Sequence, residues 1–166
     1  VAALLRDMGA AVLAYDPFVA ADSVARSVDM VSLDTLLERS DIVTLHARLT
    51  PETNGLIGAA QLARMREGSV LVNTARGGLL DYDAAVAALA SGRLGALALD
   101  VFPDEPVPEN SPLVALSRVV LSPHLAGATR HTAKRAAAIA AAEVDRYLRN
   151  EPLLHVVNGV TVGSAK

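Results

Sequence analysis

Short runs of apolar and β-branched residues recur along the chain, with segments of helix-like pattern between them. The strand-like runs cover residues 11–16, 30–32, 41–46, 69–74, 95–101 and 118–122. Several are continuously apolar, which is typical of parallel strands covered on both faces. Helices are expected over 32–39, 59–67 and 83–91. This alternation predicts right-handed crossovers and a doubly wound parallel α/β sheet.

The ends of the expected helices carry capping signals. Thr35 and Glu38 stand at capping-box spacing, and Asp81 or Asp83 is the N-cap candidate of the third helix. Gly92 follows that helix where a left-handed C′ residue is common. A longer helix is expected over 129–150, because its apolar residues recur with a helical period, namely Ala136, Ile139, Ala140, Val144, Tyr147 and Leu148.

Composition narrows the possible functions. Apolar residues make up 52% of the 166 residues but aromatic residues only 3%, so Ala, Val and Leu must build the core. The net charge of −3 gives no basic footprint, so no nucleic-acid partner is expected. The absence of cysteine excludes disulfides and thiolate chemistry and allows a reducing cytosol. No apolar run approaches the roughly 18 residues of a membrane span, and no cluster has metal-ligand spacing, so neither membrane nor metal is expected.

Three polar residues follow three successive strand-like runs. Arg76 closes the run VLVNTAR, Glu105 lies beyond the run that ends in Asp100, and His124 follows RVVLSP. In a parallel α/β sheet, ligands bind outside the carboxyl ends of the strands. A cation, a carboxylate and an imidazole delivered there suit proton and hydride transfer at a carbonyl. Each has a plainer interpretation: a surface arginine in a turn, a solvated acid and a structural histidine.

The start of the chain predicts a gap in the sheet. Residues 1–8 have a helical pattern and lead through Gly9 into the run AVLAYD, but no strand and no G-x-G-x-x-G precede them. In the strand order 3-2-1-4-5-6, the missing strand is the central one. We therefore expect two inner strands to face a gap, and the chain to be a fragment that is poorly stable alone or borrows a strand. A fragment of this kind is expected to be inactive by itself.

Asp16, at the end of AVLAYD, has several interpretations. A carboxylate there can accept hydrogen bonds from the adenosine ribose and repel a 2′-phosphate, which favours NAD over NADP. Asp16-Pro17 is also a common turn former, and a methyltransferase that binds another nucleoside would use an acid at the same place.

Four motifs in order, LTPETNGLI, NTARGGLLD, DVFPDEP and SPHLAGAT, strongly resemble the signatures of the D-isomer-specific 2-hydroxyacid dehydrogenases. The resemblance runs from Val1 to about Asn158. It implies a Rossmann-type dinucleotide-binding domain over residues 1–127, a long crossover helix over 128–150, and a tail over 151–166 that belongs to a second, substrate domain. It also implies a homodimer in the cytoplasm.

The resemblance also implies roles for individual residues. Arg76 would bind the substrate carboxylate and carbonyl, His124 would be the acid/base, and Glu105 would pair with His124. Further cofactor contacts would come from His46, Ala47, Thr74, Ala75, Asp100 and Gly127, in addition to Asp16, Arg76 and His124. Arg48 departs from the family pattern, which usually has proline there; we expect a looser turn, with this side chain in solvent.

The expected function is that of an NAD-dependent oxidoreductase, which transfers a hydride between nicotinamide and a D-2-hydroxy acid or 2-keto acid. Two alternatives stay open on the sequence. One is a non-catalytic, NAD(H)-sensing binding protein like the corepressors of this family. The other is an inactive remnant, because the phosphate-binding loop is absent from these residues.

Overall fold

The computed structural model describes residues 1–19, 28–125 and 127–157. The chain divides into two compact units, residues 1–123 and 124–166. Of the tail expected over 151–166, residues 158–166 lie outside the described part of the chain.

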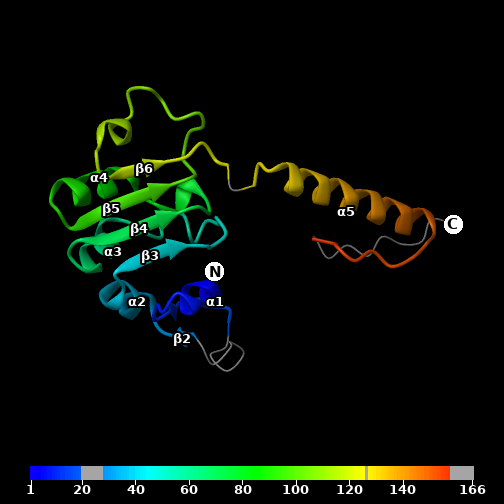
Figure 1. Cartoon of the computed structure of the whole chain (residues 1–166), viewed down its shortest axis with the longest axis horizontal. Helices are drawn as coiled ribbons and strands as arrows, with labels where there is room; N and C mark the ends of the chain where they lie inside the picture. Colours follow the sequence, from blue (N-terminus) through cyan, green and yellow to red (C-terminus); the bar gives the residue numbers. More distant parts are fainter. Residues whose placement is uncertain (20–27, 126, 158–166) are drawn as a thin grey trace. The chain divides into compact units, whose positions relative to one another are not determined.

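A four-stranded parallel sheet forms the centre of the first unit (Figure 1). Its strands, in spatial order, are β3 (Ile42–Leu45), β4 (Ser69–Asn73), β5 (Leu94–Leu99) and β6 (Val119–Leu121). The spatial order of the strands is also their order along the chain. Because neighbouring strands are parallel, each connection returns the chain to the end of the sheet where the next strand starts. The parallel α/β sheet expected from the sequence is confirmed.

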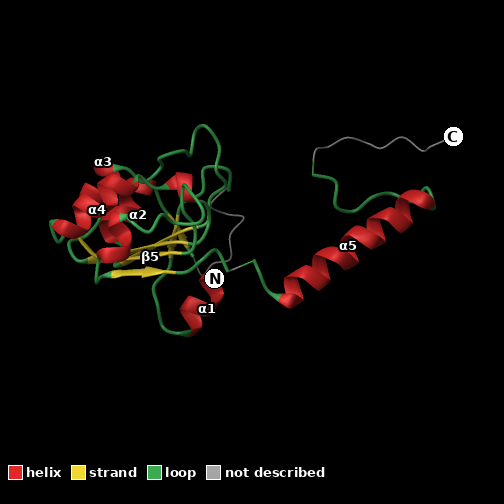
Figure 2. Cartoon of the chain, turned by 90° about the horizontal axis from the view of Figure 1, so that it is seen from above, coloured by secondary structure: helices red, strands yellow, loops and turns green. Residues whose placement is uncertain are grey.

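Three helices lie on one face of this sheet, as Figure 2 shows. They are α2 (Leu33–Arg39), α3 (Ala59–Arg64) and α4 (Tyr82–Ala90). The core between sheet and helices is mostly leucine, and Leu37, Leu71 and Leu97 have no exposed surface. Full burial of such a side chain stabilises the fold by about 1.5–3 kcal/mol. These contacts fix where the strands end, and therefore where the polar residues lie.

The first helix and the first two strands form a separate part of the first unit. Helix α1 (Ala2–Asp7) leads to β1 (Leu13–Ala14), which pairs in parallel with β2 (Asp29–Met30). Among the described residues, no strand joins this pair to β3, so the predicted gap is present. The side chain of Ile42, on the outer strand β3, is 64% exposed.

The described part of the second unit contains a long helix, α5 (Arg130–Leu148), close to the bounds expected from the sequence. Thr129 is its N-cap, and the Thr129 side chain accepts a hydrogen bond of 3.0 Å from the Thr132 N–H. Large apolar side chains of this helix, Val144, Tyr147 and Leu148, are exposed. Within the described ranges, none of the helices has both the length and the apolar character that crossing a membrane would require.

Candidate active site

The carboxyl ends of the four main strands lie side by side in register. Leu45 of β3 pairs with Asn73 of β4, Asn73 with Leu99 of β5, and Leu99 with Leu121 of β6. The residues that directly follow are His46, Thr74, Asp100 and Ser122. The sheet therefore gathers three of the predicted site residues, and a serine, along one edge.

Asn73 shapes the segment that follows β4. Its side chain is fully buried, and its amide nitrogen donates to the Arg76 carbonyl at 2.9 Å. Its amide oxygen accepts from the Ala75 N–H at 3.1 Å. The backbone from Thr74 to Arg76 is therefore held as a turn at the end of the strand. The Arg76 side chain is exposed, and its guanidinium donates to the Ala75 carbonyl at 2.6 Å.

Asp100 is only 5% exposed and is tied to both neighbouring strand ends. Its N–H donates to the Asn73 carbonyl at 3.0 Å, and the Ser122 hydroxyl donates to its carboxylate. A buried carboxylate needs such donors, because removing its charge from water is costly. Asp100 is thus fixed in orientation by groups from β4 and from the end of β6.

Glu105 lies in the loop that follows β5, and its peptide bond to Pro106 is cis. One oxygen of its carboxylate accepts from the Phe102 N–H at 3.0 Å. The neighbouring phenol of Tyr82 donates to the Val101 carbonyl at 2.7 Å. Burial, and then the Glu105 carboxylate, raise the pKa of Tyr82 to about 12.

His124 and Gly127 belong to the second unit. His124 has a φ of 54°, in the left-handed region that few residues other than glycine adopt. Such a conformation costs about 1–3 kcal/mol and is concentrated at functional sites. A Cβ added at Gly127 would meet no atom of the described residues within 4 Å. The predicted pairing of His124 with Glu105 stays a prediction.

Asp16 lies at the carboxyl end of β1, in the separate strand pair. Its carboxylate accepts from the Phe18 N–H at 2.9 Å, which is the turn geometry expected of an Asp-Pro step. The turn interpretation of Asp16 therefore has direct support in its contacts. The predicted cofactor role of Asp16 stays a prediction.

The turn after β3 contains the departure at Arg48. The Thr53 hydroxyl donates to the Arg48 carbonyl at 2.7 Å and accepts from the Thr50 N–H at 2.8 Å. These bonds order the turn although position 48 is not a proline, so the backbone has its own local restraint. The Arg48 side chain is exposed, as expected, and so are His46 and Ala47 beside it. The His46 ring lies 3.2 Å from the Thr44 hydroxyl.

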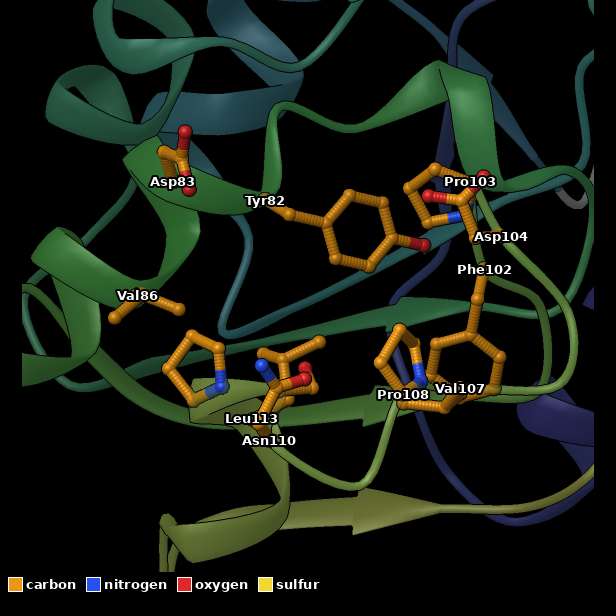
Figure 3. Close-up of a pocket in the computed structure, with 12 residues that line it drawn as sticks. Tyr82, Asp83, Val86, Phe102, Pro103, Asp104, Val107, Pro108, Asn110 and Leu113 are labelled. Atoms are coloured by element: carbon orange, nitrogen blue, oxygen red, sulfur yellow. The ribbon is translucent and has the colours of Figure 1, made fainter.

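A pocket of about 330 Å³ lies between α4 and the loop that follows β5 (Figure 3). Tyr82, Val86, Phe102, Val107 and Leu113 supply much of its apolar lining. None of the predicted site residues lines this pocket. In the described part of the chain, no group of His, Asp and Glu side chains is arranged to hold a metal ion.

Sequence reasoning missed Asn73, Ser122 and Tyr82. Asn73 and Ser122 carry a usable signal, because a short polar side chain at the end of an apolar strand often bonds to nearby backbone or polar groups. Tyr82 carries no comparable signal, since its partner Val101 is nineteen residues away in the chain.

A parallel sheet with polar residues across its carboxyl edge defines the class of protein, an α/β fold with a ligand site at the strand ends. Residues 1–126 match the family described as D-isomer specific 2-hydroxyacid dehydrogenase, NAD binding domain. The chain belongs to this family, as its motifs predicted.

Relatives in this family share both sequence and fold with the chain. The D-3-phosphoglycerate dehydrogenase of Archaeoglobus fulgidus is 40% identical over 148 residues, which are 89% of this chain and 28% of that protein. The D-lactate dehydrogenase of Lactobacillus jensenii, solved with NAD+, has a TM-score of 0.86 at 29% identity over 95% of this chain and 51% of that one.

A 2-hydroxyacid dehydrogenase of Xanthobacter autotrophicus Py2, solved with NADPH and MES, has a TM-score of 0.83 at 34% identity. The match covers 95% of this chain and 64% of that one. The chain therefore spans roughly a quarter to two thirds of the length of these three relatives.

Proposed function

We propose that this chain supplies the nicotinamide side of the active site of an NAD-dependent oxidoreductase acting on a D-2-hydroxy acid or the corresponding 2-keto acid. The observation that carries the proposal is the register of β3 to β6. This register sets His46, Thr74 and Asp100 along one edge, with Arg76 and Glu105 in the loops that leave it. Family membership supplies the reaction class.

The described residues fit the nicotinamide end of the cofactor. The buried, oriented carboxylate of Asp100 would accept a hydrogen bond from the carboxamide nitrogen of nicotinamide. Thr74 and Ala75 would contribute backbone groups of the turn that Asn73 holds. Gly127 has no side chain and would let the backbone approach the cofactor closely. A bound nicotinamide supplies or accepts the hydride. The sequence contains no G-x-G-x-x-G, so we assign no residue to the pyrophosphate.

Arg76, Glu105 and His124 are the proposed catalytic residues. The planar guanidinium of Arg76 suits a substrate carboxylate, because it can donate two parallel hydrogen bonds. His124 would donate the proton to the carbonyl oxygen during reduction and accept it from the hydroxyl during oxidation. Glu105 would orient the His124 ring and favour its protonated form.

NAD is the proposed cofactor, in preference to NADP. The exposed carboxylate of Asp16, at the end of β1, would bind ribose hydroxyls through the oxygen that Phe18 does not use and repel a 2′-phosphate. His46 and Ala47 would line the cofactor from the turn after β3. The homodimer and the cytoplasmic location expected from the family resemblance stay predictions.

His124 gives the sharpest test of the proposal. In the complete protein, His124→Asn should lower kcat for 2-keto acid reduction by roughly 10²–10⁴-fold, the usual contribution of a positioned acid. The affinity for NADH should change little, because the ring acts on the substrate proton. Steady-state assays with a panel of 2-keto acids measure the first effect, and fluorescence titration with NADH measures the second.

His131→Asn is the matched control, because His131 lies in the first turn of α5, outside the proposed site. It should leave kcat unchanged. Undiminished turnover by His124→Asn would remove His124 from the mechanism. NADH binding by the parent without turnover of any keto acid would favour the non-catalytic sensor instead.

A further inference from the structure

The loop that carries Glu105 is attached to the core at its base. Val101 and Phe102, the first residues after Asp100, are 1% and 8% exposed. The Phe102 N–H donates to the Glu105 carboxylate at 3.0 Å, so the position of Glu105 follows that of the Phe102 backbone. Whatever fixes the Val101–Phe102 peptide therefore also fixes the Glu105 carboxylate.

The chain segment that follows Arg76 touches the base of this loop at two neighbouring peptides, Phe102–Pro103 and Val101–Phe102. At the first, Gly77 packs against Phe102 so closely that a Cβ on Gly77 would overlap the Phe102 carbonyl group. Real Cβ atoms do not approach backbone atoms to such a distance. Glycine at position 77, next to Arg76, therefore brings the backbones of the Arg76 and Glu105 segments into direct contact.

Tyr82 makes the second contact. This residue is the first of α4, and the N-cap Asp81 holds that end of the helix by accepting from the Ala84 N–H at 3.0 Å. The Tyr82 hydroxyl donates to the Val101 carbonyl at 2.7 Å. Figure 3 shows the Tyr82 ring spanning from α4 toward Phe102 and Pro103, with its hydroxyl at that end.

The Tyr82 phenol is suited to a permanent structural hydrogen bond. Burial and the Glu105 carboxylate raise its pKa to about 12, so the hydroxyl keeps its proton, and its ability to donate, throughout the neutral range. The bond also satisfies a carbonyl that water does not reach, since Val101 is buried.

We propose that Tyr82 is a positioning residue, which holds the Glu105 loop in place relative to Arg76 through its bond to Val101. We call this bond, together with the Gly77–Phe102 contact, the Tyr82 brace. The inference rests on the proposed function, because it needs Glu105 to orient His124. It adds a residue that does not lie at the end of a strand. Tyr82 would affect catalysis only through the position of Glu105.

Tyr82→Phe in the complete protein removes the donor and keeps the aromatic ring. The kcat for reduction should fall roughly three- to tenfold, the factor expected when a hydrogen bond of ordinary strength is lost. The KM for NADH should stay within about twofold, since the brace touches no proposed cofactor residue.

The pH profile separates positioning from general loss of stability. A carboxylate beside an imidazole favours the protonated ring, which is the form that donates a proton during reduction. If Tyr82→Phe displaces Glu105, turnover in the reduction direction should fall at a lower pH than in the parent. Glu105→Gln should produce the same kind of shift, and adding Tyr82→Phe to Glu105→Gln should move the profile no further.

Tyr147→Phe is the matched control, because Tyr147 lies on α5 with its side chain 45% exposed. It should reproduce the parent in kcat and pH profile. Tyr82→Phe with the parent's kcat and pH profile, whatever its Tm, overturns the positioning role. If Glu105→Gln also matches the parent, the proposed role of Glu105 fails and the brace fails with it. If Glu105→Gln shifts the profile and Tyr82→Phe does not, only the brace fails.

Discussion

Asn73 is the residue on which the geometry around Arg76 depends most directly. It lies at the last position of β4, fully buried, and bonds through both ends of its amide to the turn that follows. Its own carbonyl also accepts from the Asp100 N–H. One side chain and its backbone therefore connect the two segments that carry Arg76 and Asp100.

Replacing Asn73 by alanine should lower the free energy of unfolding by about 1–3 kcal/mol, because the Ala75 N–H and the Arg76 carbonyl lose their partner. Urea unfolding followed by circular dichroism measures this change. The same variant should raise the KM for the keto acid, since the Arg76 turn is no longer held.

Ser69→Ala is the control at the other end of β4. Ser69 is 4% exposed, and in the described part of the chain its hydroxyl has no hydrogen-bond partner. Its removal should leave stability unchanged or slightly increased. A larger loss for Ser69→Ala than for Asn73→Ala would contradict the role assigned to the Asn73 amide.

At the scale of elements, helix ends were predicted with mixed success. Asp81 is the N-cap of α4, and Gly92 has a φ of 81°, so both signals at this helix are confirmed. The capping box expected at Thr35 and Glu38 is wrong. Ser32 is the N-cap of α2, and Glu38 pairs at 3.1 Å with Arg64 of α3. Thr35 is already inside the helix, because the chain becomes helical directly after Ser32.

In the second unit, the chain after α5 turns back along the helix (Figure 1) and is hydrogen-bonded to it. The Glu143 carboxylate on α5 accepts from the Leu154 N–H at 3.0 Å and from the His155 N–H at 3.4 Å. It also lies 3.1 Å from the His155 ring nitrogen Nδ1. Three contacts to one carboxylate attach the tail to the C-terminal part of the helix.

This attachment should be lost in acid. The hydrogen bond from the His155 side chain, with smaller contributions from the backbone donors, lowers the pKa of Glu143 below its ordinary value of 4.5. A lowered pKa in the folded form means that the stabilisation is complete above the ordinary pKa and disappears as the pH falls through the lowered one. NMR-detected hydrogen exchange of the Leu154 and His155 amides should show protection near pH 7, which is lost only when the pH falls below the ordinary pKa of 4.5.

Glu143→Ala should abolish the protection of both amides at every pH. Asp145→Asn is the control, because it removes the exposed ion pair with Arg149 on the same helix and leaves Glu143 in place. Unchanged protection in Glu143→Ala would show that the tail is held by other contacts.

At the scale of the whole chain, the main feature is that the strands form two separate sheets. The pair β1–β2 and the sheet β3–β6 are both parallel, but among the described residues no strand connects them. Among the described residues, β3 has a partner strand on one side only, and such an edge is a template for pairing with another chain.

The 166-residue chain studied alone should therefore self-associate as its concentration rises. Sedimentation velocity over a concentration series measures this. Ile42→Lys should reduce association, because it places a charge on the edge strand β3, where the native side chain is 64% exposed. Val144→Lys on α5, where Val144 is 58% exposed, is the comparison.

A monomer at all concentrations would contradict the open edge as an association site. A larger effect of Val144→Lys than of Ile42→Lys would instead assign the association to the exposed apolar side of α5.

The sequence by itself determined which segments form strands and helices, the parallel order of the main sheet and the gap beside β3. These features follow from local patterns: apolar runs of strand length, helical periodicity and residues that favour particular backbone angles. The motifs also determined the family, because the residue types of the strand ends are themselves the signature.

Only the tertiary structure decided how those strand ends are held. Asn73 joins the Arg76 turn to Asp100, Ser122 orients the Asp100 carboxylate, and Tyr82 reaches Val101 across nineteen residues of chain. Such bonds depend on the register of strands and on the entry angle of α4, which the packing of leucines against the sheet sets. A local sequence pattern does not predict a hydrogen bond to a residue that is distant in the sequence and comes near only in the folded structure.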